Sequence, residues 1–254
     1  MHDSCLRTLG CALAVGALSC LGMSAASAAG SGSHPDLSGV WGPYIEPGRA
    51  FGFGPGPALP FTVQGKAKVD AYRALVAPTN DNPGAHCLGY GMPLSMVFSG
   101  GYPMEIIQRP EQITIIYEAY GEIRRLYLGD KILPLADRPP DRDGYSAAHW
   151  QGDTLVVETT TLREQEDSSY PHSDQARITE RYHLEKGTNG ARILVADWTL
   201  TDPAFYTRPV VSQKKWTFDP KGILLPYECD EEGWLDHLQS LRDKRPGKHK
   251  AYAQ

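Results

Sequence analysis

Apolar and polar residues alternate over many short stretches of the chain, and clusters of Gly, Pro, Asp or Asn separate these stretches. Successive side chains of a strand face opposite sides of a sheet, so a period of two predicts β-strands. Most links between the stretches are too short to hold a crossover helix, which predicts antiparallel pairing in a closed or nearly closed barrel. Eight strands are predicted, with Leu37 to Trp41 as a candidate ninth: Leu94 to Phe98, Met104 to Gln108, Gln112 to Tyr120, Glu122 to Leu128, Thr154 to Leu162, Ala176 to Leu184, Arg192 to Leu200 and Val210 to Phe218.

Two segments follow the helical period instead. Apolar residues recur at helical spacing from Phe61 to Val76, and Thr62 can cap the start of this helix. The same spacing occurs from Glu232 to Arg242, near the C-terminus. The pattern therefore predicts a mainly β fold, an antiparallel barrel of about eight to nine strands with short N-terminal and C-terminal helices.

The N-terminal residues have the pattern of a secretory leader. One basic residue, Arg7, precedes an apolar segment from Leu9 to Met23, and small residues end in Ala26-Ser27-Ala28. We expect residues 1–28 to be a signal peptide, 29–242 a single domain and 243–254 a flexible basic tail. A membrane anchor would need a longer apolar run. Lipid attachment at Cys20 is the other alternative, although the residues before it fit the usual pattern poorly.

Cysteine usage agrees with export. Of the five cysteines, three lie in the leader, so the domain keeps Cys87 and Cys229. Two thiols in an oxidising compartment are more often paired than free, which predicts a disulfide in a periplasmic or secreted protein. The alternative, a reactive cysteine or a thiolate metal ligand, needs a reducing compartment.

Charge and motifs exclude several classes of partner. The net charge of −5 offers no electrostatic footprint for nucleic acid. The sequence contains no zinc-binding motif and no phosphate loop, and its Gly-x-Gly-x-Gly run at residues 52–56 is interrupted by proline. Ser146 lacks the second glycine of a nucleophile elbow, because Ala148 stands there. We therefore expect no cofactor, no metal, no nucleic acid and no membrane span.

Polar residues recur in the middle of the predicted strands. Glu158, for example, lies on the opposite strand face from Leu155. These polar faces either look into the barrel lumen or form its wetted outer surface, which is common for antiparallel sheets. In the first case the cluster comprises Glu118, Arg125, Glu158, Glu180, Arg181, Asp197 and Tyr206.

His149 is the best single candidate for proton transfer. Its position before Trp150 predicts a place at the mouth end of a strand, and a histidine of ordinary pKa changes charge near neutrality. An exposed loop histidine without function is the alternative. The aromatic content, including Trp198, is typical of proteins that bind ring-containing molecules.

Several motifs resemble known groups of proteins. The stretch Asp36-Leu-Ser-Gly-Val-Trp41 resembles the Gly-x-Trp opening of lipocalin-like barrels. The run from Trp150 to Thr159 is similar to a mark of a large group of secreted, mostly uncharacterised bacterial proteins, as are Thr179-Glu-Arg181, Asp202-Pro-x-x-Tyr-Thr-Arg-Pro209 and Tyr227-Glu-Cys229. The resemblance implies an exported lipocalin-like barrel and transfers no established activity. Two departures are Asp230-Glu-Glu-Gly, where the group tends to have His-Glu-Gly-Asn, and Arg177, where it often has His.

These observations predict a protein that binds a small hydrophobic or aromatic molecule in a barrel pocket. The alternative is a cofactor-independent lyase, isomerase or hydrolase that uses His149 or a lumenal carboxylate as acid or base, with Arg181 stabilising negative charge. A third class is a scaffold that binds partners through the outside of the sheet. Expected catalytic residues are His149, Glu158 and Arg181, and expected ligand-binding residues are Glu118, Arg125, Glu180, Asp197, Trp198 and Tyr206.

Overall fold

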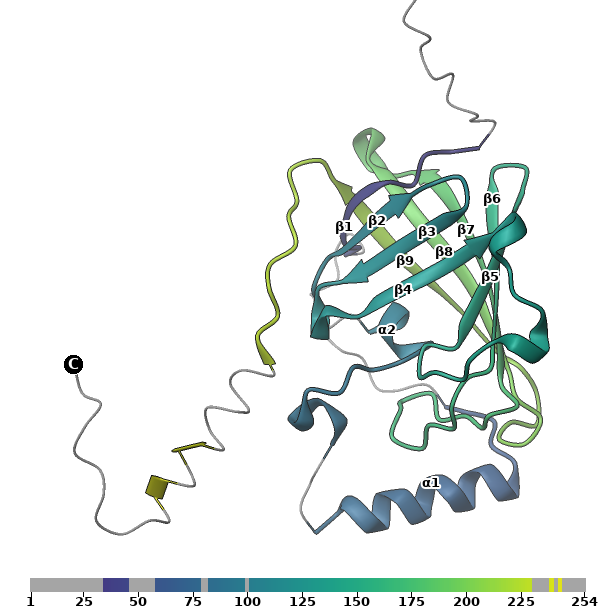
Figure 1. Cartoon of the computed structure of the whole chain (residues 1–254), viewed down its shortest axis with the longest axis vertical. Coiled ribbons are helices and arrows are strands. Elements are labelled where there is room, and N and C mark those ends of the chain that lie inside the picture. Colours follow the sequence, from purple (N-terminus) through teal and green to yellow (C-terminus); the bar gives the residue numbers. More distant parts are fainter. Residues whose placement is uncertain are drawn as a thin grey trace, which may run out of the picture. The chain divides into compact units, whose positions relative to one another are not determined.

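The computed structural model describes residues 34–45, 58–78, 82–98, 101–229, 238–239 and 242–243. Within these residues nine strands close into a barrel, in which β1 pairs with both β2 and β9 (Figure 1). The predicted barrel is thus confirmed. Its strands are β1 (Gly39–Pro43), β2 (Met104–Gln108), β3 (Gln112–Tyr117), β4 (Ile123–Leu128), β5 (Tyr145–Gln151), β6 (Thr154–Thr160), β7 (Arg177–Lys186), β8 (Arg192–Thr201) and β9 (Val210–Asp219).

One strand pair is parallel, which corrects the prediction of a wholly antiparallel barrel. β4 and β5 run in the same direction, with Leu126 opposite Ser146. Between them the chain has to return to the end of the barrel at which β4 began. Residues 129–144 make this return as a crossover loop, which contains the 3-10 turns η3 (Gly129–Lys131) and η4 (Leu135–Asp137).

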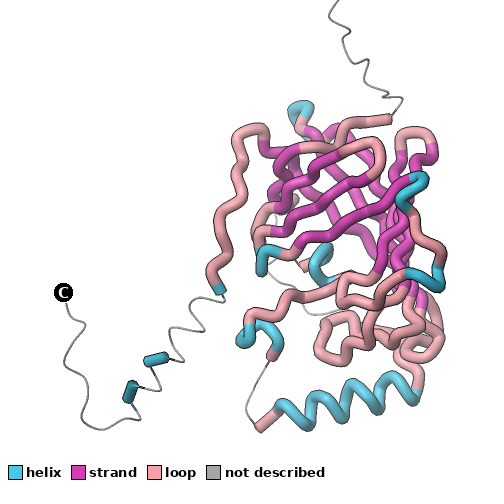
Figure 2. The backbone as a smooth tube through the Cα atoms, in the orientation of Figure 1, coloured by secondary structure: helices cyan, strands magenta, loops and turns pink. Residues whose placement is uncertain are grey.

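The strand predicted from Leu94 to Phe98 is also wrong, because this segment forms the single helical turn α2 (Leu94–Val97). Its backbone bonds include Val97 N–H donating to Pro93 O and Phe98 N–H donating to Leu94 O. A short apolar run fits a buried turn of helix as well as a strand, so periodicity alone cannot separate the two. Figure 2 shows α1, α2 and many loops gathered at one end of the barrel, which we call the α2 end.

The helix α1 (Val63–Val76) confirms the first predicted helix and its cap. Thr62 Oγ1 accepts a hydrogen bond from Gly65 N–H at 2.9 Å. A Cβ at Gly65 would lie 2.6 Å from Phe205 O, so only glycine lets the helix approach this loop so closely. The second predicted helix, Glu232 to Arg242, lies outside the described residues apart from residues 238, 239 and 242.

Large apolar side chains line the inside of the barrel. Along β3, for example, buried Ile113, Ile115 and Tyr117 alternate with less buried residues. Trp41 of β1 is 0% exposed, and Leu194 of β8 is equally buried. Each such side chain contributes about 1.5 to 3 kcal/mol by leaving water, so this inward face supplies much of the stability.

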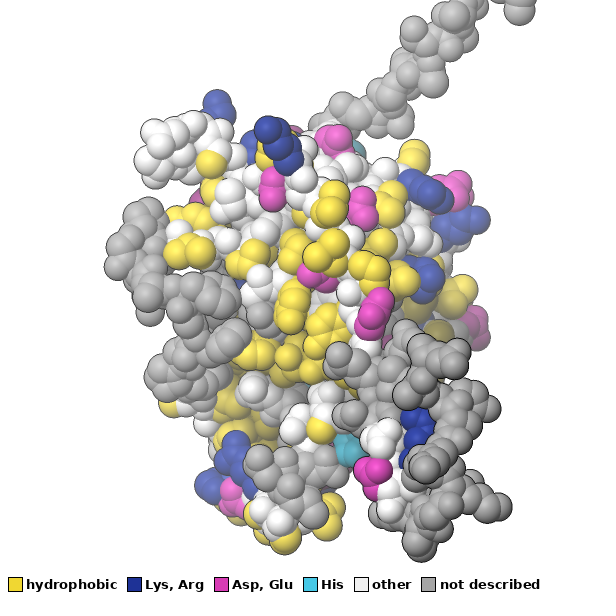
Figure 3. Space-filling model, turned by 90° about the vertical axis from the view of Figure 1, so that its left-hand side faces the viewer, with side chains coloured by type: hydrophobic (Ala, Val, Ile, Leu, Met, Phe, Trp, Pro, Cys, Tyr) yellow, Lys and Arg dark blue, Asp and Glu magenta, His cyan; other side chains and the backbone are white. Residues whose placement is uncertain are grey.

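The segment after β9 runs back along the outside of the barrel (Figure 1). It is attached where Leu225 N–H donates to Glu118 Oε2 at 2.8 Å. Two of its side chains, Ile223 and Leu225, are 69% and 60% exposed. Figure 3 shows hydrophobic side chains gathered across the middle of one face of the molecule. None of the described helices is both long and apolar enough to cross a membrane.

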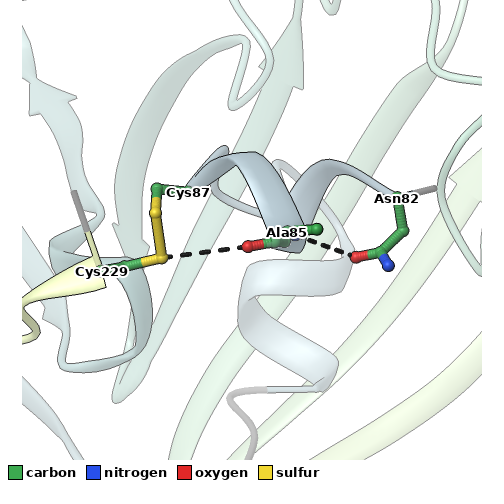
Figure 4. Close-up of a disulfide and its surroundings, with 5 residues drawn as sticks. Asn82, Ala85, Cys87 and Cys229 are labelled. Carbon is green, nitrogen blue, oxygen red and sulfur yellow. Dashed lines mark hydrogen bonds between the residues drawn. A yellow bond between two sulfur atoms is a disulfide. The ribbon is translucent and has the colours of Figure 1, made fainter. Parts of the chain in front are cut away.

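Cys87 and Cys229 form the predicted disulfide (Figure 4). Their Cα atoms are 5.5 Å apart across a sequence separation of 142 residues. Cys87 follows the 3-10 turn η1 (Pro83–His86), where Asn82 Oδ1 accepts a hydrogen bond from Ala85 N–H at 3.1 Å. The bridge therefore ties the segment before α2 to the segment after β9.

We expect the double variant Cys87→Ala/Cys229→Ala to lose about 2 to 4 kcal/mol of unfolding free energy, because its unfolded chain is no longer constrained by the long loop. Guanidinium unfolding of the oxidised wild type and the double variant measures this difference. Wild type treated with a reductant serves as the control and should match the double variant. Equal stability of the oxidised wild type and the double variant would contradict the prediction.

Candidate functional site

A buried ion pair lies inside the barrel. Arg124 of β4 and Glu180 of β7 face inward. Each lies two residues from a buried apolar side chain, Leu126 or Ile178, and therefore on the same face of its strand. Their side chains are 1% and 0% exposed. Two nitrogens of Arg124 donate to the two Glu180 oxygens at 2.8 and 2.6 Å. Such a bidentate pair offsets the cost of burying both charges only if the remaining polar atoms are also satisfied.

Three hydroxyl groups complete the bonding of this pair. Arg124 donates to Ser146 Oγ at 3.0 Å and to Thr159 Oγ1 at 2.8 Å, while Tyr182 Oη donates to Glu180 Oε2 at 2.6 Å. Burial disfavours the guanidinium charge, but Glu180 outweighs this effect and raises the pKa of Arg124 well above its ordinary value. Burial, followed by the Glu180 charge, raises the pKa of Tyr182, so its phenol keeps the proton that it donates. We call these five residues the interior network.

Three buried donors around the interior network have no acceptor in the described part of the chain: Tyr117 Oη, Trp198 Nε1 and Trp216 Nε1. Each of the three side chains is 1% exposed. Trp198 is the register partner of Glu180 across β7 and β8, and the Trp216 ring stacks on Tyr182 with centroids 6.4 Å apart. A buried donor without an acceptor costs about 1 to 3 kcal/mol, so an acceptor placed here would be stabilising.

Lys214 brings a further cation to this interior. It lies on the same face of β9 as Trp216, two residues away, and its Nζ is 5.9 Å from the centre of the Trp216 ring. Burial alone lowers the pKa of Lys214, since no carboxylate of the described residues offsets it. A partly desolvated ammonium without a counter-charge favours an anionic or electron-rich neighbour.

Two carboxylates lie near each other at the α2 end. Glu122, just before β4, accepts hydrogen bonds from Gly91 N–H at 3.0 Å and Ser95 Oγ at 2.9 Å. Asp143, just before β5, has a buried Oδ1 without a hydrogen-bond partner among the described residues. Burial, followed by the charge of Glu122, raises the pKa of Asp143 to about 7. Burial also raises the pKa of Glu122. A carboxyl that titrates near neutrality has the property required of a general acid or base.

Other buried polar atoms at this end also lack a partner within the described ranges: Arg142 Nε, Gln165 Oε1 and His172 Nε2. His172 Nδ1 lies 3.0 Å from Tyr170 O, and donation there assigns the proton to Nδ1 and leaves Nε2 as an acceptor. Burial lowers the pKa of His172, so the ring is neutral. All seven buried side-chain polar atoms without a described partner thus lie beside the interior network or at the α2 end.

Four predicted site residues lie on the outer surface. The expected lumenal position is wrong for Glu158, Arg181 and Arg125, whereas His149 lies near the end of β5. His149, Glu158, Arg181 and Arg125 are all exposed. They occupy strand positions that alternate with inward-facing residues, and the strand period therefore turns them outward. Glu158 pairs there with Arg177 at 3.4 Å, both side chains being about half exposed.

The other predicted residues are divided between the interior and the loops. Glu180 and Trp198 are the two that the structure brings together inside the barrel. Glu118 and Tyr206 are also buried, but each bonds to backbone of a loop segment. Asp197 is half-buried on the outer side of β8. The predicted cluster of seven is therefore replaced by a different inner set, of which Glu180 and Trp198 are the shared members.

Sequence reasoning missed most of that inner set, namely Tyr117, Arg124, Ser146, Thr159 and Tyr182. It also missed Asp143 at the α2 end. A signal for Arg124 was present, because it shares the strand period of Leu126 and Leu128. A charged residue in step with an apolar face is the pattern that indicates a buried, paired charge. Asp143 carries no such signal, since it precedes β5 in a loop.

The described residues contain no group of three or more His, Cys, Asp or Glu side chains that could hold a metal ion. No protein-family model matches the chain, and no curated protein matches it.

Proposed function

We propose that the protein binds a small ring-containing molecule inside the barrel, beside the interior network. The observation that carries this proposal is the set of three buried donors without acceptors, Tyr117 Oη, Trp198 Nε1 and Trp216 Nε1. A ligand with carbonyl, hydroxyl or carboxylate oxygens would accept these hydrogen bonds and remove the cost of leaving them unpaired. The indole and phenol rings would supply the contact area for its apolar part.

We propose that a ligand reaches this site by displacing α2. Met96 of α2 is 0% exposed, and its sulfur lies 3.3 Å from the Tyr182 hydroxyl of the interior network. A helix of one turn is held by few hydrogen bonds, so displacing it costs less free energy than opening the sheet. Ligand exchange through the α2 end is part of the proposal.

We also propose that the protein is exported and acts in the periplasm or outside the cell. The disulfide supports this location, because such bonds persist in oxidising compartments. The leader pattern of residues 1–28 supports it independently. Membership of the secreted bacterial group that the motifs resemble remains a prediction.

An enzyme is the second candidate function, and Asp143 is the observation that favours it. A carboxyl with a pKa of about 7 and a buried, unpartnered oxygen suits proton transfer to a bound molecule. This assignment replaces the exposed His149 and Glu158 by an acid at the α2 end. The reaction class would be a cofactor-independent proton transfer.

The test is mass spectrometry of small molecules released from the purified, denatured protein, followed by titration of the folded protein with the molecule found. We expect the double variant Trp198→Phe/Trp216→Phe to bind it about 10- to 100-fold more weakly, because two hydrogen bonds are lost while the rings are kept. Trp150→Phe is the control, since this ring lies at the far end of β5 and stacks on His34 with centroids 4.8 Å apart. Equal affinity of wild type and the double variant would contradict binding at this site.

The same experiment separates a carrier from an enzyme. A carrier returns the molecule unchanged after incubation, whereas an enzyme converts it. If it is converted, Asp143→Asn should abolish turnover and leave binding nearly intact. Turnover that survives Asp143→Asn would exclude Asp143 as the proton-transfer group.

A further inference from the structure

A cavity of about 550 Å³ lies on the outer side of the barrel, where the crossover loop passes over the sheet. We call it the crossover pocket. Its wall on one side is the turn between β2 and β3, and on the other side it is the crossover loop that the parallel β4–β5 pair requires. Its volume falls within the range of small-molecule sites. The residues that matter to its chemistry are Arg109, Glu111, Tyr127, Lys131, Leu133 and Tyr145.

The pocket has a rigid aromatic floor. Tyr127 and Tyr145 face outward from β4 and β5, and their rings stack with centroids 4.8 Å apart at an interplanar angle of 13°. The Tyr145 hydroxyl accepts a hydrogen bond from Leu133 N–H at 2.8 Å and donates to Lys131 O at 3.1 Å. The guanidinium of Arg138 also lies over the Tyr145 ring, 5.0 Å from its centre. The crossover loop is thus fixed to the floor, and the aromatic surface is organised before any ligand binds.

One of the two cations that line the pocket has no ion pair within the described part of the chain. Lys131 and Glu111 neutralise each other at 3.7 Å. Arg109 also lines the pocket, and its exposed guanidinium makes no ion pair with any described residue. Guanidinium binds carboxylates with two parallel hydrogen bonds, which gives it both affinity and orientation for this group.

We propose that the crossover pocket binds a planar aromatic carboxylate, with its ring against Tyr127 and Leu133 and its carboxylate on Arg109. This site is separate from the interior site proposed above, because its floor consists of the outward-facing residues of β4 and β5. Leu133 is 42% exposed, so part of its apolar surface is free to cover a ring. The pocket exists because one strand pair is parallel and the chain has to cross over the sheet.

The test is isothermal titration calorimetry with 2-naphthoate and with its neutral counterpart 2-naphthamide. Arg109→Gln is expected to weaken 2-naphthoate binding about tenfold or more and to leave 2-naphthamide binding unchanged, because only the acid uses the charge. Tyr127→Leu should weaken the binding of both. Arg208→Gln removes an exposed arginine elsewhere on the surface and should change neither affinity.

Equal affinity of 2-naphthoate for wild type and Arg109→Gln would overturn the proposal, as would no detectable binding to wild type at millimolar concentration. The variant Trp198→Phe/Trp216→Phe separates this site from the interior site. It should keep its affinity for 2-naphthoate if the acid binds in the crossover pocket. Loss of binding in that variant, with binding retained in Arg109→Gln, would assign the acid to the interior and refute the crossover pocket.

Discussion

Glu180→Gln is expected to lower the free energy of unfolding by about 3 to 5 kcal/mol, because it leaves the buried guanidinium of Arg124 without its counter-charge. Arg124 and Glu180 are almost fully buried and joined by two short hydrogen bonds. The amide keeps the shape of the carboxylate, so the loss reflects charge and hydrogen bonding rather than a cavity. Urea unfolding followed by tryptophan fluorescence measures it.

Glu158→Gln is the matched control for this change. Glu158 lies on the neighbouring strand β6 and also pairs with an arginine, Arg177, but both partners are about half exposed. Exposed pairs contribute about 0 to 1 kcal/mol, so this variant should differ little from wild type. A loss below about 1 kcal/mol for Glu180→Gln would show that the interior pair is not structurally important.

The double variant Arg124→Met/Glu180→Leu separates the cost of an unpaired charge from the value of the pair. Apolar side chains of similar size often replace a buried ion pair without loss, so this variant should recover most of the stability. If it also loses ligand binding, the pair is retained for function rather than for folding. Retained binding would instead assign recognition to the three unpaired donors.

The strand period predicted the barrel well but assigned several side chains to the wrong face. For β6 the alternation of Leu155 and Glu158 was recognised in the sequence, yet it cannot say which face is inside when both carry apolar residues. In the structure Val156 and Val157 are both buried, although consecutive strand residues point to opposite faces. Closure of the barrel decides the inward face, and closure is a property of all nine strands together.

The strand β5 was not among the predicted strands, and this explains why the parallel pair of β4 and β5 was not expected. Its sequence, Tyr145 to Gln151, contains two alanines and follows a loop rich in Pro and Asp, so its β signal is weak. Without β5, a long link joins the predicted strands Glu122 to Leu128 and Thr154 to Leu162. Nothing in that link indicates a parallel pair. β5 pairs with β6 over its whole length through the short turn at residues 152–153. Its parallel pairing with β4, which sets Leu126 opposite Ser146, is the longer-range contact that no local pattern encodes.

The disulfide and the cap at Thr62 could be predicted because each depends on few residues. Two cysteines in an oxidising compartment leave one intramolecular pairing, and a threonine before an apolar helical period has a defined local geometry. The interior network is different, since its five residues come from four strands. Their meeting follows from the register of the barrel, which the sequence does not specify locally.

Asp143→Asn is expected to make the protein more stable above neutral pH and to flatten its pH dependence. Burial and Glu122 raise the pKa of Asp143 from 3.8 to about 7, so between these values the folded protein holds a proton that the unfolded chain has lost. Stability therefore falls as the pH rises through this window and levels off above it. At about 1.4 kcal/mol per pKa unit, the wild type loses on the order of 4 kcal/mol that the asparagine variant keeps.

The measurement is the difference in unfolding free energy between Asp143→Asn and wild type from pH 4 to pH 8. Using the difference is necessary because other groups at the α2 end titrate as well. The raised pKa of Glu122 also makes stability fall as the pH rises. The lowered pKa of His172 has the opposite effect, because stability rises with pH as long as the pH is below the ordinary histidine pKa of 6.5. Asp153→Asn, in the exposed turn between β5 and β6, should show no such trend. A difference between Asp143→Asn and wild type that stays constant across this range would mean that Asp143 is ionised throughout, and the acid–base role proposed for it would fail with it.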